Sequence, residues 1–228
     1  MEKLAGTAHP ITLVLEEIYA IFKKQGFSVA TGPELEDEWH NFDALNVPKD
    51  HPARDMQDTF FVKGRPGFVL RTQTSSVQIR YMESHQPPFA IIAPGKVFRN
   101  ESTDATHEMQ FHQIEGLVVG EDITVEHLKS VLLSFLQELF GEGTEIRLRP
   151  SFFPFVEPGF EVDAKVGDKW LELGGAGMVH PNVFESVKYD KTTSGFAFGM
   201  GLDRLVNVKL GITDVRYAYQ GDLRLNQW

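Results

Sequence analysis

The segment from Gly95 to Gly116 combines a basic and an aromatic residue on either side of a polar loop. Arg99 ends one predicted strand, His107 lies in the loop, and Phe111 opens the next predicted strand. A guanidinium can bind a phosphate and an aromatic ring can stack on a base, so together they could hold a nucleotide. The ordinary alternative for Arg99 is a surface salt bridge, because most exposed arginines have no chemical role.

A second candidate feature is the glycine-rich run from Ser194 to Leu210, SGFAFGMGLDRLVNVKL, which leads from a predicted strand into a predicted helix. The helix carries Arg204 near its first turn. Three glycines of the strand could let a ligand lie against the backbone: Gly195, Gly199 and Gly201. Such turns often only permit tight packing, but two arginines and Phe111 together could clamp a triphosphate and sandwich an adenine.

Two helices and a group of strands must position these residues. Apolar residues recur at helical spacing over 11–24 and over 125–139, with Thr124 as the expected N-cap and Gly141 behind the second helix. The predicted strands are Phe89 to Phe98, Phe111 to Val119, Glu145 to Arg149, Phe160 to Val166 and Trp170 to Leu173. The strands cluster between the helices instead of alternating with them, which favours an α+β fold with an antiparallel or mixed sheet. With no repeat or linker visible, residues 1–228 are interpreted as one domain.

The segment from Asn41 to Gln73 carries three of the 12 prolines and little sustained periodicity. Long irregular segments of compact domains are usually functional loops or lids. A solvated surface excursion is the alternative interpretation.

Composition narrows the function classes. The formal net charge of −10 argues against a free-standing platform for a nucleic-acid backbone. The absence of cysteine excludes disulfides and thiolate metal sites. The first residues show neither a signal-peptide pattern nor a membrane span, so we expect a cytoplasmic protein with no membrane partner.

Several ordered motifs carry a resemblance to a known family. FRNESTDATH with FHQIEG resembles motif 2 of class II aminoacyl-tRNA synthetases, GFAFGMGLDRL resembles motif 3, and TGPELED with Pro33 resembles motif 1. More narrowly, RTQTSSVQIR, RPSFFPFVEPG and GAGMVHPNV are similar, in order and spacing, to the α subunit of bacterial phenylalanyl-tRNA synthetase. The resemblance covers about Ala8 to Trp228 and implies the class II catalytic fold, an antiparallel sheet flanked by helices.

The resemblance implies an ATP site. Arg99 would contact the α-phosphate and neutralise the charge that builds as a carboxylate attacks phosphorus. Arg204 and Phe111 would sandwich the adenine ring. His107 would assist at the phosphates, although a loop histidine is often merely solvated. No general base is needed, because an amino-acid carboxylate is already ionised at neutral pH.

The resemblance also implies a pocket for phenylalanine. Phe153 and Phe155 match a pair whose rings pack edge-to-face against the substrate side chain, although three phenylalanines within four residues could equally be core. Val156, Ala197 and Gly199 would form the apolar wall and floor, with Ala197 beyond the para edge of the ring.

The ammonium end of the substrate would be held by polar side chains. Gln113 and Glu115 are two apart on one predicted strand and therefore face the same way. Glu115 can pair with the ammonium, and Ser75 would add a polar contact. Glu157 falls where the family has a Mg²⁺-binding carboxylate shared with a β subunit, although it could be an ordinary surface glutamate.

The resemblance finally implies partners. The family assembly has two α and two β subunits, and its members carry a coiled-coil arm for tRNA ahead of the catalytic domain. Here the His9-Pro10 pair that opens the catalytic domain comes at the start, so we expect the arm to be absent and tRNA(Phe) to bind only weakly.

Three functions follow for testing. The first is an enzyme that activates L-phenylalanine with ATP and, in a complete assembly, transfers it to tRNA(Phe). The second is a synthetase-like module that senses an amino acid or joins a complex without catalysis. The third is a ligase with an acceptor other than tRNA.

Overall fold

The architecture is a seven-stranded sheet with helices on both faces, seen in a computed structural model that describes residues 8–55, 58–104, 108–219 and 221. The strands, in their order across the sheet, are β1 (Ser28–Val29), β4 (Phe89–Phe98), β5 (Gln110–Gly120), β9 (Ser194–Gly201), β8 (Lys169–Val179), β7 (Val156–Val166) and β6 (Glu145–Phe153). All neighbours are antiparallel except β1 and β4, which are parallel. The mixed α+β sheet predicted from the sequence is therefore confirmed.

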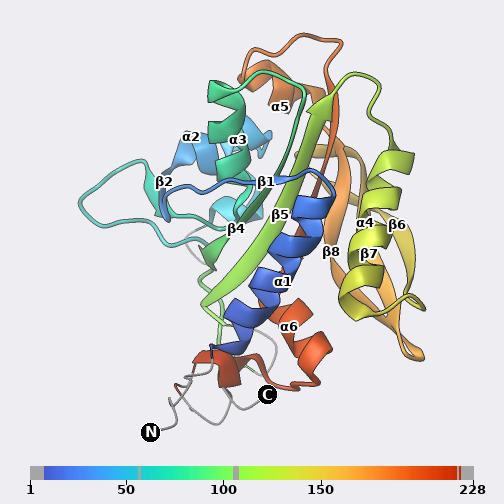
Figure 1. Cartoon of the computed structure of the whole chain (residues 1–228). Coiled ribbons are helices and arrows are strands. Elements are labelled where there is room, and N and C mark those ends of the chain that lie inside the picture. The colour runs from blue at the N-terminus through green and yellow to red at the C-terminus, as the bar shows by residue number, and fades with distance from the viewer. Residues whose placement is uncertain (1–7, 56–57, 105–107, 220, 222–228) are drawn as a thin grey trace, which may run out of the picture.

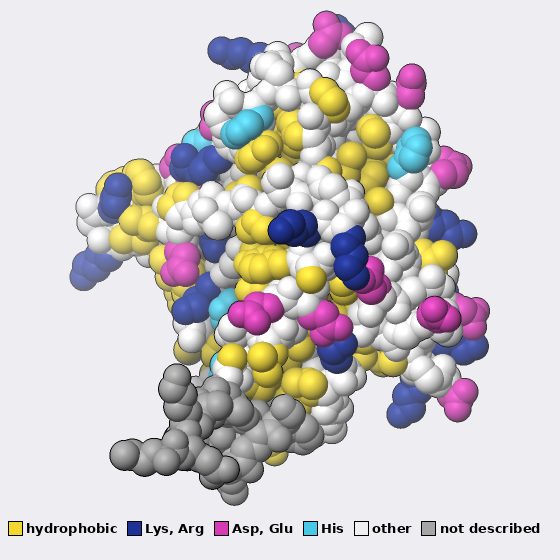
Figure 2. All heavy atoms as spheres, in the orientation of Figure 1, with side chains coloured by type: hydrophobic (Ala, Val, Ile, Leu, Met, Phe, Trp, Pro, Cys, Tyr) yellow, Lys and Arg dark blue, Asp and Glu magenta, His cyan; other side chains and the backbone are white. Residues whose placement is uncertain are grey.

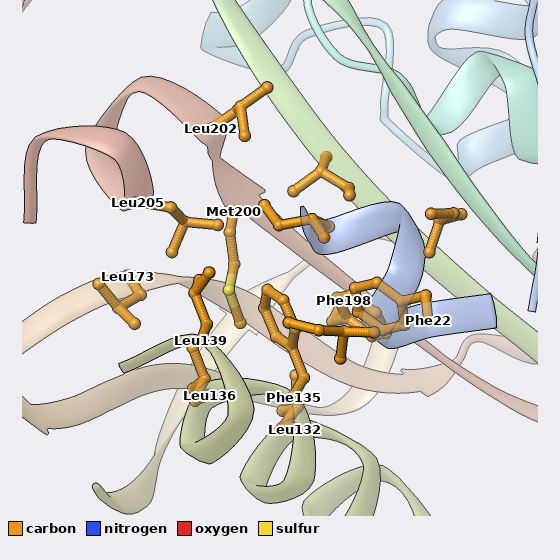
Figure 3. Close-up of a cluster of buried hydrophobic side chains, with 14 of the residues drawn as sticks. Phe22, Leu132, Phe135, Leu136, Leu139, Leu173, Phe198, Met200, Leu202 and Leu205 are labelled. Carbon is orange, nitrogen blue, oxygen red and sulfur yellow. The ribbon is translucent and has the colours of Figure 1, made fainter. Parts of the chain in front are cut away.

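One face of the sheet is covered by α1 (Pro10–Lys24), α4 (Val125–Phe140) and α6 (Leu202–Leu210), which lie in front of it in Figure 1. The ring of Phe22 stacks on those of Phe135 and Phe198, with centroids 4.6 and 5.6 Å away, and all three are labelled in the cluster of Figure 3. Burying a side chain of this size stabilises the fold by ~1.5–3 kcal/mol. The two long predicted helices are thus confirmed, and they share one face.

Local signals account for the ends of these helices. His9 precedes α1 and accepts the amide of Ile11 at Nδ1, 3.2 Å away. Thr124 caps α4 as predicted, in a reciprocal capping arrangement with His127, and Gly141 follows its last residue. Both helices present their apolar stripe to the sheet.

The opposite face is covered by shorter elements. These are α2 (Glu38–Asn41), α3 (Ser75–Ser84), α5 (Pro181–Ser186), the 3₁₀ helices η1 (Asp43–Leu45) and η2 (Pro52–Arg54), and a small antiparallel pair, β2 (Leu35–Asp37) with β3 (Phe68–Leu70). A further 3₁₀ helix, η3 (Val215–Tyr219), follows α6.

The proline-containing segment 41–73 is irregular as predicted, but only part of it is a surface excursion. Phe42, Ala44, Leu45 and Val69 are buried in the second core, beneath α3 and α5. The segment between them carries η2 and most of the exposed residues. The segment thus forms one wall of the second face.

The charged side chains on the surface are mixed in sign. On the face shown in Figure 2, basic and acidic side chains are interspersed, and neither kind gathers into one patch. No helix in the described part of the chain combines the length and the apolar composition needed to cross a membrane.

Candidate active site

A cavity of about 530 Å³ opens on the second face of the sheet, between β5, β8, β9, α3 and the turn that joins β6 to β7. We call it the inner cavity. Its lining includes every residue predicted to hold an amino acid: Ser75, Gln113, Glu115, Phe153, Phe155, Val156, Ala197 and Gly199. Segments more than a hundred residues apart in the chain are thereby brought to one site.

Glu115 is the buried charged group of this cavity. It lies on β5 and points at the first turn of α3, where its Oε1 accepts the amide of Thr74 (3.1 Å). Its Oε2 accepts hydrogen bonds from the Ser75 hydroxyl (2.5 Å) and from the Gln78 side-chain amide (3.0 Å). Burial raises the pKa of Glu115, and the bonds from Ser75 and Thr74 partly oppose that rise. The carboxylate is thus fixed in place while keeping oxygen lone pairs free.

Gln113 lies two residues before Glu115 on the same face of β5. Its side-chain oxygen is buried, and no described residue donates a hydrogen bond to it. An unpaired buried acceptor is costly, so such a group is expected to meet a donor when the cavity is filled. An oxygen of this kind next to a carboxylate suits a ligand ammonium.

Phe153 is the last residue of β6, and Phe155 is the second residue of the tight turn that leads into β7. Their rings are nearly parallel (22°), with centroids 6.1 Å apart, and both line the inner cavity. The turn is held from outside the hairpin, because Asn46 donates to the Pro154 carbonyl (2.6 Å) and the His180 amide donates to the Phe155 carbonyl (2.9 Å). The neighbouring Phe152 is 83% exposed, so the two inward rings are selected by the strand alternation and the turn.

Small residues on β9 shape the opposite wall. Gly199 faces Glu115, and a Cβ there would lie 3.1 Å from the Glu115 Cγ. Its lack of a side chain therefore leaves space for the carboxylate. Gly195, which the sequence suggested as a ligand-facing glycine, instead packs against the Val118 carbonyl oxygen, 2.5 Å from where its Cβ would be. Its role is the close pairing of β9 with β5.

A second hollow of about 670 Å³ adjoins the first and is called the outer cleft. It is lined by Arg99, Phe111 and Arg204, the three described residues predicted to hold ATP. His107, the fourth, lies outside the described residues. Arg99 and Phe111 also line the inner cavity, so the two hollows meet at this pair.

The two arginines of the outer cleft differ in their contacts. The Arg99 guanidinium lies over the Phe111 ring, 5.0 Å from its centroid, and its Nε donates to the Thr72 carbonyl at 3.4 Å. Arg204 is exposed at the start of α6. The guanidinium that contacts Phe111 in this structure is thus that of Arg99, whereas the sequence resemblance assigned the Phe111 sandwich to Arg204.

Glu157, the predicted magnesium ligand, lies outside both hollows. Its side chain is 76% exposed, and its Oε2 lies 3.4 Å from the His180 Nε2. A lone carboxylate suits Mg²⁺ only when other oxygen ligands come from elsewhere, since imidazole is not a preferred ligand of this ion. The residues of this chain therefore fit a magnesium site only as one contributor.

Another cluster of possible metal ligands consists of Glu36, Asp37 and His40, and these side chains already pair with groups of the protein. His40 contacts Asp37 at 2.8 Å, and Glu36 forms an ion pair with Arg80.

Sequence reasoning missed several residues that hold the site. Thr74 and Gln78 act through Glu115, as described above. Arg71 is 3% exposed, and its guanidinium donates to the carbonyls of Lys96 (2.7 Å) and Gly32 (3.1 Å), which joins the motif 1 segment to β4. The available signal was the run RTQTSSVQIR, which contains all three but has no obvious chemistry.

Comparisons with known proteins agree with this geometry. A family profile described as tRNA synthetases class II core domain (F) matches residues 2–228. The phenylalanine–tRNA ligase α subunit of Syntrophotalea carbinolica is 53% identical over 232 residues, which span 96% of this chain and 68% of the relative. The α subunits of Geotalea uraniireducens and Thermotoga petrophila are 55% and 54% identical and are covered to 68% and 67%.

The chain belongs to the phenylalanine–tRNA ligase α-subunit family. The family named from the sequence motifs is confirmed, as is its class II core fold. Members of class II tRNA synthetases are ligases that use ATP. A solved structure of pyrrolysyl-tRNA synthetase from Desulfitobacterium hafniense matches with a TM-score of 0.73 at 20% identity, covering 93% of this chain and 74% of that one, which supports the fold alone.

Proposed function

We propose that this chain activates L-phenylalanine with ATP to form phenylalanyl-adenylate, and that an assembly containing a β subunit then transfers the phenylalanyl group to tRNA(Phe). The observation that carries the proposal is the junction of the two hollows at Arg99 and Phe111. An amino acid in the inner cavity and a nucleotide in the outer cleft would meet there, which is the geometry that adenylate formation requires.

The inner cavity would hold phenylalanine by both of its ends. The substrate ammonium would pair with the Glu115 carboxylate and donate to the unpaired Gln113 oxygen. The phenyl ring would pack against Phe153 and Phe155, with Ala197 at its far edge. The substrate carboxylate would then point toward Arg99.

The chemistry at the junction is positioning and charge neutralisation. A carboxylate oxygen of phenylalanine attacks the α-phosphorus of ATP and forms a new P–O bond. The bond from that phosphorus to the bridging oxygen breaks, and pyrophosphate leaves with the electron pair. Arg99 would neutralise the growing negative charge on the α-phosphate, and no protein base is required because the attacking group is already ionised.

The outer cleft would take the rest of the nucleotide. We assign adenine stacking to Phe111 and Arg204, which requires the Arg99 guanidinium to move from its present place over the Phe111 ring to the phosphate. His107 is retained as a phosphate contact. Mg²⁺ would shield the phosphates when bound, and Glu157 would contribute one ligand to a further magnesium site completed by the β subunit.

Four other expectations remain predictions. Residues 1–228 would act as one catalytic domain, the assembly would be α₂β₂, the acid-rich chain would bind tRNA(Phe) only weakly by itself, and the protein would be cytoplasmic. A regulatory module without catalysis is not favoured, because such a module has no need of the Arg99, Phe111 and Arg204 set.

Phenylalanine-dependent exchange between ATP and labelled pyrophosphate tests the proposal, with the chain measured alone and with its β subunit. We expect phenylalanine, and not tyrosine or leucine, to stimulate exchange. Exchange with a different amino acid would overturn the substrate assignment, and its absence under both conditions would overturn the activity. Charging of tRNA(Phe) by the assembly would then separate a synthetase from a ligase with another acceptor.

A further inference from the structure

A hydrogen-bonded triad of His112, Asp203 and Tyr219 lies at the outer cleft, whose lining includes Asp203 and Tyr219. His112 and Asp203 are adjacent in sequence to Phe111 and Arg204. Pairing of β5 with β9 ends at Gln113 and Gly201, where β9 gives way to α6. The next β5 amide, that of His112, donates instead to the Asp203 Oδ2 at 2.5 Å. No other hydrogen bond between β5 and α6 occurs in the described part of the chain.

The side chain of Tyr219, at the end of η3, completes this arrangement. Its hydroxyl donates to the Asp203 Oδ1 (2.5 Å) and lies 3.0 Å from the His112 Nδ1, from which it can accept. The Asp203 carboxylate is therefore held by one residue of β5 on one oxygen and by the tyrosine on the other. We call these three residues the clip. Burial and the negative charge of Asp203 raise the pKa of Tyr219, so the hydroxyl stays a donor.

The backbone next to Tyr219 is in turn held by a contact with the residue that precedes α1. His9, which caps α1 through its Nδ1, places its Nε2 3.1 Å from the Ala218 carbonyl, next to Tyr219 in η3. Asp203 is 6% exposed, so loss of the tyrosine hydroxyl would leave a buried carboxylate oxygen without its donor. Relaxation of that oxygen would move the first turn of α6.

We propose that Tyr219 is a positioning residue for the nucleotide site, acting through Asp203 to fix Arg204 relative to Phe111. The inference rests on the proposed ATP site and goes beyond it. Arg204 is exposed, so the backbone of α6 is what places its guanidinium over the cleft. A shift of about 1 Å at such a contact can cost as much as 100-fold in rate.

The test compares two tyrosines of η3 in the chain assembled with its β subunit. Tyr219→Phe removes the hydroxyl and keeps the ring, and Tyr217→Phe is the matched control, because Tyr217 is 46% exposed and outside both hollows. In ATP–pyrophosphate exchange we expect Tyr219→Phe to raise the KM for ATP by about 10-fold, the scale of one hydrogen bond to a charged group. The KM for phenylalanine should stay within about twofold, and the control should match the parent in both.

A second variant tests whether Tyr219 acts through the carboxylate. Asp203→Asn should raise the KM for ATP by itself, and adding Tyr219→Phe to it should have little further effect. Full additivity of the two changes would contradict the proposal. So would an unchanged KM for ATP in Tyr219→Phe, or an equal rise in both KM values together with a lowered Tm, which is the pattern of a general structural role.

Hydrogen exchange separates failure of this inference from failure of the proposed function. The His112 amide, bonded to Asp203, should exchange slowly in the parent and in Tyr217→Phe but faster in Tyr219→Phe. If the parent shows no pyrophosphate exchange, the proposed function fails and the role in ATP binding fails with it. Unchanged protection in Tyr219→Phe would overturn the clip whatever the activity.

Discussion

The inner cavity and the outer cleft share a wall but differ in how their polar groups are held. In the inner cavity, Glu115 is buried and receives three hydrogen bonds from α3 and the residue before it. In the outer cleft, Arg204 is exposed, and Arg99 lies over the ring of Phe111. The polar groups of the inner cavity are thus held by the protein without a ligand, whereas under the proposed function Arg99 would have to move for the outer cleft to bind a nucleotide.

The difference follows from the free-energy cost of leaving each charged group without a ligand. A carboxylate out of water needs donors of its own, so the fold must supply them whether or not phenylalanine is bound. A guanidinium at the surface is hydrated and needs no partner. Under the proposed function, the polar groups that would recognise the amino acid are therefore built into the core, and those that would bind the charged nucleotide remain adjustable.

The largest effect is expected from removal of the junction residue. Arg99→Ala should lower the turnover of pyrophosphate exchange by about 100- to 1,000-fold, because a charged contact to the negative charge that develops on the α-phosphate is lost. The control is Arg65→Ala, since Arg65 also lies over a phenylalanine ring, that of Phe68 at 4.0 Å, but outside both hollows. Equal activities of the two variants would contradict the role of Arg99.

Loss of the Glu115 charge should act on the amino acid instead. Glu115→Gln is expected to weaken phenylalanine binding by ~2–3 kcal/mol, the scale of a charge-assisted hydrogen bond, with little effect on ATP binding. Glu121→Gln, at an exposed glutamate just beyond the end of β5, is the control. Calorimetric titration with phenylalanine and with ATP measures the two affinities separately. An equal loss of affinity for ATP would remove the distinction between the two sites.

The raised pKa of Glu115 predicts a pH dependence with two opposite signs. Phenylalanine binding needs the ionised form, so affinity should fall as pH falls through a pKa above the ordinary 4.5. Burial favours the protonated form of Glu115 in the folded protein. The stabilisation that the protonated side chain contributes to folding is therefore full below its unfolded-state pKa of about 4.3 and is lost as the pH rises through its folded-state pKa. Titration calorimetry and urea unfolding across that range should show the two trends, and both should vanish in Glu115→Gln.

The smallest effect concerns the far end of the phenyl pocket. Ala197→Gly should admit para-substituted phenylalanines while costing about 1 kcal/mol in binding of phenylalanine itself, and Ala197→Val should shrink the pocket. Ala164→Gly is the control, because Ala164 is buried in the core on the other face of the sheet. Exchange assays with para-chlorophenylalanine decide the matter: acceptance by the control, or rejection by Ala197→Gly, would contradict this placement.

The elements with a strong apolar pattern were predictable from the sequence. α1 and α4 follow the helical spacing closely, and β4 and β5 agree with prediction to within about a residue. Strand β8 was predicted only to Leu173, because the glycines that continue it, such as Gly174 and Gly175, have low strand propensity. They pair because β9 and a phenylalanine ring pack against them: a Cβ at Gly174 would meet the Gly199 carbonyl oxygen, and one at Gly175 the Phe153 ring.

Helix α3 was missed for a different reason. Its buried residues include Ser75, Ser76 and Gln78, so it has no continuous apolar stripe, and Thr74 gives it no side-chain cap. The carboxylate of Glu115 supplies the missing acceptor from 41 residues further along the chain. The same tertiary bonding explains the candidate site: the residues that would touch a ligand could be proposed from sequence, but those that hold them, such as Asp203 and Tyr219, could not.

The most direct test of the contrast between the sites is calorimetric titration of L-phenylalanine into the protein without ATP. If the inner cavity is organised in advance, the parent should bind phenylalanine with one site per chain, and Arg204→Ala, which removes a guanidinium that lines the outer cleft and not the inner cavity, should bind it with the same affinity. Binding that requires ATP, or that is lost with Arg204, would contradict a preformed amino-acid site.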